Sequence, residues 1–287
     1  MLQPAARRWY TLSEMAPSSA VWKCGPALLL LSAPLLTDGR QAAPLIREEQ
    51  HVLVDGRPEV WRLEWTTPPQ PVCDPDNTDW FTCPCSGFAF GERGKLDLVR
   101  LRQGREVERL PLAPLFEGSE PPADSGDAVL QRWDVRESDM DHIDWKHPDR
   151  PSVVPGVRSR TQTKAMDLAD YDHDGQATEF LLQTNSTPCG HRYGVVVGVS
   201  RQIPRLHAFG TAAHPKEPLV MDVRAWRALL HSQAPTRVVV WACGDHAADT
   251  ETEMEVGATS GSIHVTSREY QCDDHDKRGK LISEKPL

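Results

Sequence analysis

The sequence lacks the features of several large protein classes. Aromatic residues make up 7% of its 287 positions, and its longest apolar run is well short of the roughly 20 residues that a membrane-spanning helix needs. The absence of several such runs excludes a polytopic membrane protein, and the absence of a strict repeat excludes a collagen-like chain or a coiled coil. With 25% charged and 39% hydrophobic residues, the composition is that of an ordinary globular protein with one or two domains.

Basic residues and catalytic motifs are also scarce. Lys and Arg number 32 against 41 Asp and Glu, which gives a formal net charge of −9. Because no long basic stretch interrupts this balance, we expect no nucleic-acid partner. The chain has no His-Glu-x-x-His, no Gly-x-Ser-x-Gly, no phosphate-binding loop and no dinucleotide glycine fingerprint, which lowers the expectation of an enzyme without removing it.

The N-terminal segment is typical of a secretory leader. An apolar run at residues 27–36 follows Lys23 and is too short to cross about 30 Å of hydrocarbon. We expect residues 1–43 to be removed, with Met1 or Met15 as the start; a buried N-terminal helix is the alternative. The remaining chain is expected to be secreted or periplasmic, without a membrane span.

The cysteine count favours disulfides. The chain has seven cysteines, and loss of Cys24 with the leader leaves six, an even number that is typical of disulfide bonds in an exported chain. The pairings considered are Cys243 with Cys272, and Cys73 with Cys83 or Cys85. A zinc site beginning at Cys83-Pro84-Cys85 is the alternative, although no second closely spaced cysteine pair accompanies it. The disulfide candidates are Cys73, Cys83, Cys85, Cys189, Cys243 and Cys272.

Short apolar runs separated by turn residues predict strands after the leader. Residues 51–54 and 60–65 flank Asp55-Gly56, a pattern typical of a β-hairpin. A second hairpin and further strands are expected at residues 96–110, 194–199, 206–209, 237–241 and 262–265.

One helix is predicted near residues 222–231. Asp222 can cap its first turn, and Val223, Trp226 and Leu230 share one apolar face that is expected to pack on a sheet.

These patterns predict a mainly β fold, α+β at most. Short antiparallel strands would form a β-propeller-like or sandwich-like domain with the one packed helix. We expect residues 44–287 to form a single β-rich domain, or two lobes divided near the proline-rich and acidic residues 134–155.

Three carboxylates alternate before a glycine in the segment that begins at Asp170. Calcium loops take oxygens from their first, third and fifth residues and a backbone carbonyl from the seventh, and they need glycine at the sixth. Asp170, Asp172, Asp174, Gly175 and Gln176 occupy these positions in order. Because carboxylates this close repel one another without an ion, the spacing predicts a Ca²⁺ site. A solvated acidic turn is the alternative.

The residues around this loop do not fit an EF-hand. That motif needs an acid at the twelfth position, where Leu181 stands, and a helix on each side. Residues 164–169 and 179–183 favour strands instead, so a strand-loop-strand arrangement is expected.

The segment from Asp167 to Gly175, with Phe180-Leu181-Leu182 after it, resembles the calcium loop of FG-GAP or VCBS-type repeats. In that family the loop recurs in the blades of secreted or surface β-propellers, which bind partners or carbohydrate; this chain has the loop once. The resemblance implies side-chain ligands at Asp170, Asp172 and Asp174 and a carbonyl ligand at Gln176. The family has an acid at the ninth loop position, where this chain has Thr178, so Glu179 or a water is expected to complete the site.

Two other regions offer chemistry. Cys243 follows an apolar strand and would suit a cysteine nucleophile with His191 or His246 as its base, although a disulfide is favoured. The acidic, histidine-bearing loop at residues 139–149 could bind a transition metal or supply a carboxylate pair, although a solvated loop is favoured. Its polar members are Asp139, Asp141, His142, Asp144, His147 and Asp149.

The sequence therefore predicts an exported, disulfide-stabilised, calcium-binding module with a binding or structural role and an unknown extracellular or envelope ligand. A secreted hydrolase that uses Cys243 or the loop at residues 139–149 is the alternative. A third possibility is a domain that docks to an envelope partner through exposed aromatic side chains.

Overall fold

The computed structural model describes residues 45–73, 85, 87–120, 123, 126–135, 139, 154–187, 191–273 and 277–287. These belong to the unit Ala43–Leu287. The expected leader, Cys83, Cys189 and all of the loop at residues 139–149 except Asp139 lie outside the described residues. Within the described ranges, no helix combines the length and apolar character needed to cross a membrane.

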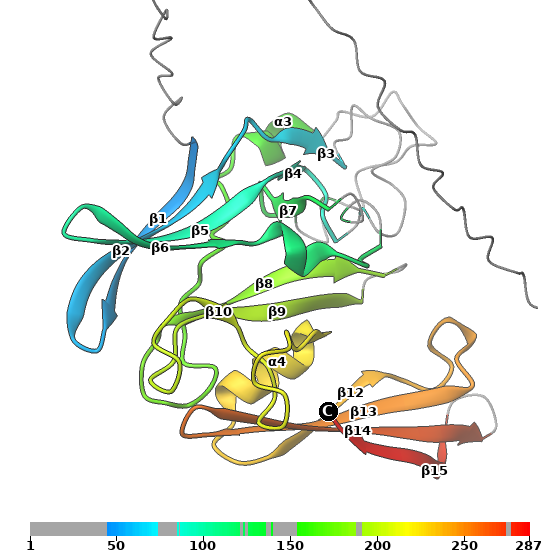
Figure 1. Cartoon of the computed structure of the whole chain (residues 1–287). Helices are drawn as coiled ribbons and strands as arrows, with labels where there is room; N and C mark the ends of the chain where they lie inside the picture. Colours follow the sequence, from blue (N-terminus) through cyan, green and yellow to red (C-terminus); the bar gives the residue numbers. More distant parts are fainter. Residues whose placement is uncertain are drawn as a thin grey trace, which may run out of the picture. The chain divides into compact units, whose positions relative to one another are not determined.

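The fold is mainly β, as predicted, and the described strands form four antiparallel sheets (Figure 1). The first sheet has the order β1 (Leu45–Val54), β2 (Arg57–Trp65), β5 (Leu96–Arg102) and β6 (Arg105–Pro111). A smaller sheet consists of β3 (Gln70–Val72), β4 (Gly91–Gly94) and β7 (Ala128–Gln131).

The other two sheets come from the second half of the chain. In one, β9 (Arg192–Gly198) pairs along one edge with β8 (Glu179–Ser186) and along the other with β10 (His207–Ala208) and β11 (Met221–Asp222). The last sheet has the order β12 (Thr236–Trp241), β13 (Thr250–Thr259), β14 (Ser262–Asp273) and β15 (Lys277–Pro286).

The hairpin turns follow from local backbone chemistry. Asp55 and Gly56, between β1 and β2, have φ angles of +49° and +73°. Positive φ at both central residues is the requirement of the tight turn whose twist matches that of the flanking strands. Gln103 and Gly104 meet the same requirement between β5 and β6. Both predicted hairpins are confirmed.

The predicted helix is α4 (Val223–His231), and the carboxylate of Asp222 accepts a hydrogen bond from the backbone N–H of Arg224 at 2.7 Å. Trp226 is fully buried and donates through Nε1 to the Gly194 carbonyl at 2.9 Å. The buried face includes Leu229, whereas Leu230 is only partly buried. The shorter helical pieces are α3 (Val154–Arg158), η2 (Ala113–Phe116) and η4 (Asp245–Ala247).

Strand β9 serves two hydrophobic cores. Val195 and Val197 are buried in a core with residues of β1, β2, β5, β7 and β8. Val196 is buried in a second core with α4 and residues of β12, β13 and β14. Because successive side chains of a strand point to opposite faces, a continuous apolar run at this position fills both cores. Figure 1 shows α4 between the β8–β9 pair and the sheet that starts with β12.

Two disulfides join described cysteines: Cys73 with Cys85, and Cys243 with Cys272. They close loops with sequence separations of 12 and 29 residues, and chain-entropy arguments give about 3 to 4 kcal/mol of stabilisation for each. Because Cys85 is paired, it cannot act as a thiolate in the zinc site considered at Cys83-Pro84-Cys85.

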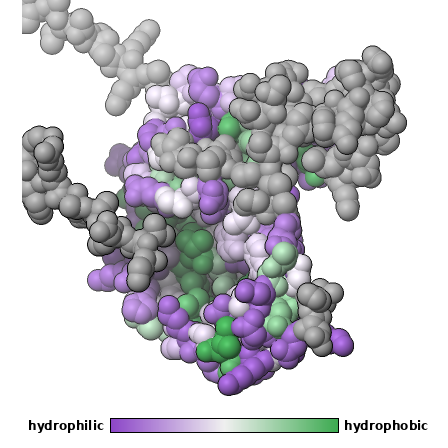
Figure 2. All heavy atoms as spheres, turned by 90° about the vertical axis from the view of Figure 1, so that its right-hand side faces the viewer, coloured by the Kyte–Doolittle hydropathy of each residue, from purple (hydrophilic) through white to green (hydrophobic). Residues whose placement is uncertain are grey.

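Where Figure 2 colours the surface by hydropathy, hydrophilic residues dominate the margins and apolar residues gather mainly in the middle. The lower part of that view belongs to the sheet of β12 to β15, where hydrophilic residues dominate around a small apolar spot. Leu281 and Ile282 of β15 are among the exposed large apolar side chains. Exposed single apolar residues of this kind are common in soluble proteins and carry no functional assignment.

Candidate metal centre

The acidic loop is closed at its base by an isolated bridge between Ala169 and Glu179. The N–H of Ala169 donates to the Glu179 carbonyl at 2.8 Å, and the N–H of Glu179 donates back at 3.1 Å. Of the two predicted flanking strands, only the second is regular, as β8; residues 164–169 contribute this bridge but no strand. Gly175 has a φ of +91°, so the tight bend expected at the sixth loop position is present and a side chain there would be strained.

Asp170, Asp172 and Asp174 come together as the sequence predicted. Each offers a carboxylate oxygen, and these oxygens all lie within 4.8 Å of one another. At this separation two negative charges repel by on the order of 3 kcal/mol at an effective dielectric constant near 20. The fold therefore places three mutually repelling groups around one point.

The described donors to these carboxylates are neutral. Asp170 accepts from the N–H groups of Asp174 and Gly175, both at 3.0 Å, and Asp174 accepts from those of Gln176 at 2.8 Å and Arg201 at 2.6 Å. Backbone amides orient the oxygens, but they supply only part of the positive charge that the cluster requires. An oxygen-rich, negatively charged cradle of this kind is suited to a hard divalent cation.

Asp172 is the most constrained member of the cluster. The residue is fully buried, and its Oδ1 accepts from the N–H of Asp174 at 3.1 Å. Its Oδ2 is buried and accepts no hydrogen bond from the part of the chain that the structure describes. Burial, followed by the negative charge of Asp174, raises the pKa of Asp172 to about 7. An unsatisfied buried carboxylate oxygen is unfavourable unless a cation or proton meets it.

Glu179, which the sequence offered as a further ligand, is fully buried beside the cluster without belonging to the group of three. Its Oε2 accepts from the N–H of Tyr171 and its Oε1 from the Thr178 hydroxyl, both at 2.8 Å. Burial, followed by the charge of Asp172, raises the pKa of Glu179 to about 9. Thr178, at the ninth loop position, thus orients the acid that follows it.

The loop contacts turns from both halves of the fold. Asp172 accepts from the N–H of Gly261, in the turn between β13 and β14, through its backbone carbonyl at 2.9 Å. The Gln176 side chain exchanges two hydrogen bonds with Asp55, in the turn between β1 and β2, at 2.7 and 3.1 Å. Both turns lie toward the left of Figure 1. These contacts use only the side chain of Gln176, so the role of its backbone carbonyl as a ligand stays a prediction.

The structure also describes two positions that the sequence offered for catalysis, Cys243 and Asp139. Cys243 is bonded to Cys272, so its sulfur is not a thiol that can act as a nucleophile. Asp139, the described member of the Asp/His loop, is buried and forms a two-point ion pair with Arg160 at 2.7 Å. In the described residues, neither position offers a free catalytic group.

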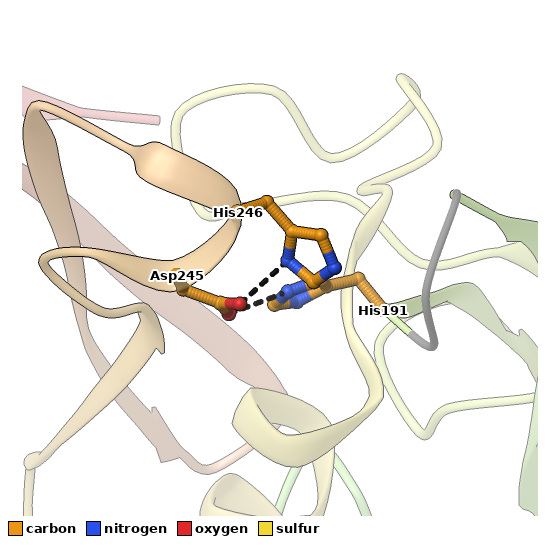
Figure 3. Close-up of side chains that lie close together, drawn as sticks. All are labelled: His191, Asp245 and His246. Carbon is orange, nitrogen blue, oxygen red and sulfur yellow. Dashed lines mark hydrogen bonds and ion pairs between the residues drawn. The ribbon is translucent and has the colours of Figure 1, made fainter.

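The two histidines considered as bases for Cys243 do meet in space. His191 and His246 both approach the carboxylate of Asp245 (Figure 3), and the three side chains offer ligand atoms within 4.8 Å of one another. Sequence reasoning missed Asp245. The only local signal was its place directly before His246 in a turn after Gly244.

Comparison of the chain with protein-family models, with curated proteins and with solved structures returns no match.

Proposed function

We propose that the protein is an exported calcium-binding module, stabilised by disulfides, with a binding or structural role toward an extracellular or envelope ligand. The observation that carries the calcium assignment is the fully buried Asp172, whose carboxylate lies in one cluster with those of Asp170 and Asp174 and whose Oδ2 accepts no hydrogen bond from the described residues. Spacing, the glycine bend and the absence of a charged donor among the described contacts support the same ion. The resemblance to FG-GAP or VCBS-type loops belongs to this proposal.

The proposed ligand set combines the cluster of carboxylates with the spacing of calcium loops. Asp170, Asp172 and Asp174 would supply side-chain oxygens and Gln176 its backbone carbonyl. Glu179 would stabilise the bound ion by its charge or, after a small movement, by direct coordination. Disulfides are typical of oxidising compartments, where free calcium is also high enough to occupy sites of moderate affinity.

The role of the ion would be to hold turns together. The loop already contacts the β1–β2 turn through Gln176 and the β13–β14 turn through Asp172, so an ion that fixes the loop also fixes strands that belong to the two hydrophobic cores. We propose that calcium makes these turns a rigid edge for ligand binding.

The test is a calcium titration of the full chain after chelator treatment. Calorimetry measures calcium binding, and thermal unfolding measures the change in Tm. Free calcium at 100 times its dissociation constant adds about 2.7 kcal/mol of stability, which for a domain of this size raises Tm by roughly 5 to 10 °C. The double variant Asp172→Asn with Asp174→Asn should abolish the rise.

Asp167→Asn is the matched control, because Asp167 is exposed and lies outside the loop. It should keep the full calcium response. Mg²⁺ should produce a smaller rise, since it demands stricter octahedral geometry and retains its waters. An unchanged Tm across saturating calcium would contradict the proposal.

A further inference from the structure

A second cluster of ligand-type side chains lies away from the acidic loop, where the η4 turn between β12 and β13 meets the start of β9. His191 directly precedes β9, and Asp245 and His246 belong to η4. Cys243, two residues before Asp245, is tied to β14 by its disulfide with Cys272. The base of the turn is therefore covalently fixed to the sheet.

The turn holds its side chains in a demanding backbone conformation. His246 and Ala247 have φ angles of +52° and +62°, in the left-handed region that non-glycine residues adopt at a free-energy cost. The result is that the imidazole of His246 faces back toward the carboxylate of its neighbour, as Figure 3 shows.

Two imidazoles share one carboxylate in this cluster. His191 Nε2 lies 3.0 Å from Asp245 Oδ2, and His246 Nδ1 lies 2.6 Å from Asp245 Oδ1. The His191 ring stacks on Trp241 at a centroid distance of 3.9 Å and an angle of 19°, which fixes its orientation. His191 is 7% exposed, whereas the His246 side chain is 43% exposed, so solvent reaches the cluster from one side.

We propose that His191 Nε2, the Asp245 carboxylate and His246 Nδ1 bind a divalent transition-metal ion, with Zn²⁺ as the best match. Imidazole nitrogen and carboxylate oxygen are preferred zinc ligands, with bonds of about 2.0 to 2.2 Å. Tetrahedral bonds of this length separate neighbouring ligand atoms by about 3.4 Å, so the two His–Asp contacts of 3.0 and 2.6 Å need to lengthen by less than about 1 Å. The exposed side leaves the fourth position to water or to a ligand.

A buried carboxylate lies near Nδ1 of His191, the ring nitrogen that does not face Asp245. Asp222 Oδ2 lies 3.8 Å from His191 Nδ1 and is almost fully buried. A metal-bound histidine almost always donates its other ring N–H to a carboxylate or carbonyl, which orients the ring and strengthens the ligand. Asp222 can accept this hydrogen bond once a small movement shortens the 3.8 Å separation.

Arg224 competes for the same position. Its Nη2 lies 3.1 Å from His191 Nδ1 and also contacts Asp222 and the Val240 carbonyl. Because an arginine only donates hydrogen bonds, this contact requires Nδ1 to be unprotonated and therefore places the ring proton on Nε2. When a metal binds Nε2, the ring proton must instead lie on Nδ1, and Nδ1 can no longer accept from Arg224. The Arg224 side chain is 49% exposed and can turn into solvent when the ion binds.

The site differs from the calcium loop in both residues and chemistry, so it is tested independently. Zn²⁺ binding to the untagged, non-reduced full chain is measured by calorimetry in saturating calcium, and Co²⁺ replaces Zn²⁺ for visible absorption. We expect one zinc site that calcium does not displace and Co²⁺ bands typical of nitrogen and oxygen ligation. Absence of zinc binding overturns the proposal.

His246→Ala and Asp245→Asn should each weaken zinc binding by at least about 10-fold, the lower limit of the loss seen when a supporting partner of a metal ligand is removed. Both side chains are partly exposed, so the fold should survive, as the unchanged melting of the metal-free variants would show. His214→Ala is the control, because His214 is exposed and pairs with Glu217 elsewhere. Wild-type affinity in His246→Ala overturns the assignment.

Arg224→Met sharpens the test of the supporting carboxylate. The variant removes the competing donor and leaves the backbone N–H that binds Asp222. We expect zinc to bind as tightly as in the wild type or up to about 10-fold more tightly. Weaker binding would overturn the assignment of Asp222 as the partner of His191.

Discussion

Two groups of buried carboxylates in this chain have opposite electrostatic surroundings. Glu59 of β2 has a fully buried side chain and accepts hydrogen bonds from Arg100 at 2.8 and 2.9 Å and from Arg102 at 2.6 Å. Asp172 and Glu179 of the acidic loop are as deeply buried, but their described donors are backbone amides and a hydroxyl. Glu59 is therefore paired with arginine side chains, whereas the described hydrogen bonds to the loop carboxylates carry no formal charge.

The pKa directions express this difference. Burial alone would raise the pKa of Glu59, but hydrogen bonds from Arg100, Arg102 and Trp61 outweigh it, and the pKa is lowered. For Asp172 and Glu179 burial prevails and like charges add to it, so both pKa values rise. Because a buried carboxylate without a charged partner is stabilised by a bound cation or a proton, the contrast supports the proposed ion site.

The largest expected effect comes from neutralising Glu59. Glu59→Gln leaves Arg100, with a side chain only 5% exposed, without its main counter-charge, and breaking one partner of a buried pair costs about 3 to 5 kcal/mol. Urea unfolding at neutral pH measures the loss. Glu49→Gln is the control, because its pair with Arg62 is solvent-exposed and such pairs contribute less than about 1 kcal/mol. Equal losses in the two variants would remove the contrast.

The pH dependence of stability gives a smaller effect with a defined sign. A carboxylate whose pKa is lowered in the folded state stabilises the protein above its unfolded pKa, and this contribution is lost as the pH falls through the folded value. Stability of the wild type should therefore fall on acidification below the ordinary glutamate range more steeply than that of Glu59→Gln. Urea unfolding midpoints between neutral and acid pH measure the difference in stability between the wild type and Glu59→Gln, which should become smaller as the pH falls. A difference that stays constant would show that Glu59 keeps an unshifted pKa.

Neutralising a carboxylate of the acidic loop should stabilise the protein, whereas neutralising Glu59 should destabilise it. In calcium-free buffer, Asp172→Asn removes one repelling charge and gives the neighbouring carboxylates a donor, so stability should rise by about 1 kcal/mol. In saturating calcium the order should reverse, because only the wild type gains binding energy. The two melting curves are compared with and without chelator, beside Asp167→Asn. A variant that is less stable in both buffers would mean that the loop carboxylates need no external cation.

Local sequence patterns predicted the parts of the fold that depend on local chemistry. Asp55-Gly56 determines its hairpin because both residues tolerate positive φ, and Asp222 determines the start of α4 because its side chain meets the first free amide. The acidic loop belongs to the same class: Asp170, Asp172 and Asp174 converge because they alternate before a glycine bend.

Long-range pairing explains what the sequence did not reveal. Glu179 is buried between Gly198 of β9, with which it pairs, and Ala169, with which it forms an isolated bridge. His191 and Asp245 are 54 residues apart and meet only through the packing of β9 near β12. The arginine partners of Glu59 lie on β5, 41 and 43 residues away. No local spacing encodes such contacts.

The smallest expected effect distinguishes the role of the Gln176 side chain from that of its backbone carbonyl. Gln176→Ala removes the two hydrogen bonds to Asp55, which are exposed, so stability should fall by only about 0.5 kcal/mol, the lower end for a hydrogen bond. Calcium affinity should stay close to that of the wild type, because the carbonyl remains in place as the seventh-position ligand. Calorimetry of Gln176→Ala beside Asp174→Asn measures the difference. Loss of binding in both variants would make the Gln176 side chain, and with it the β1–β2 turn, part of the calcium site.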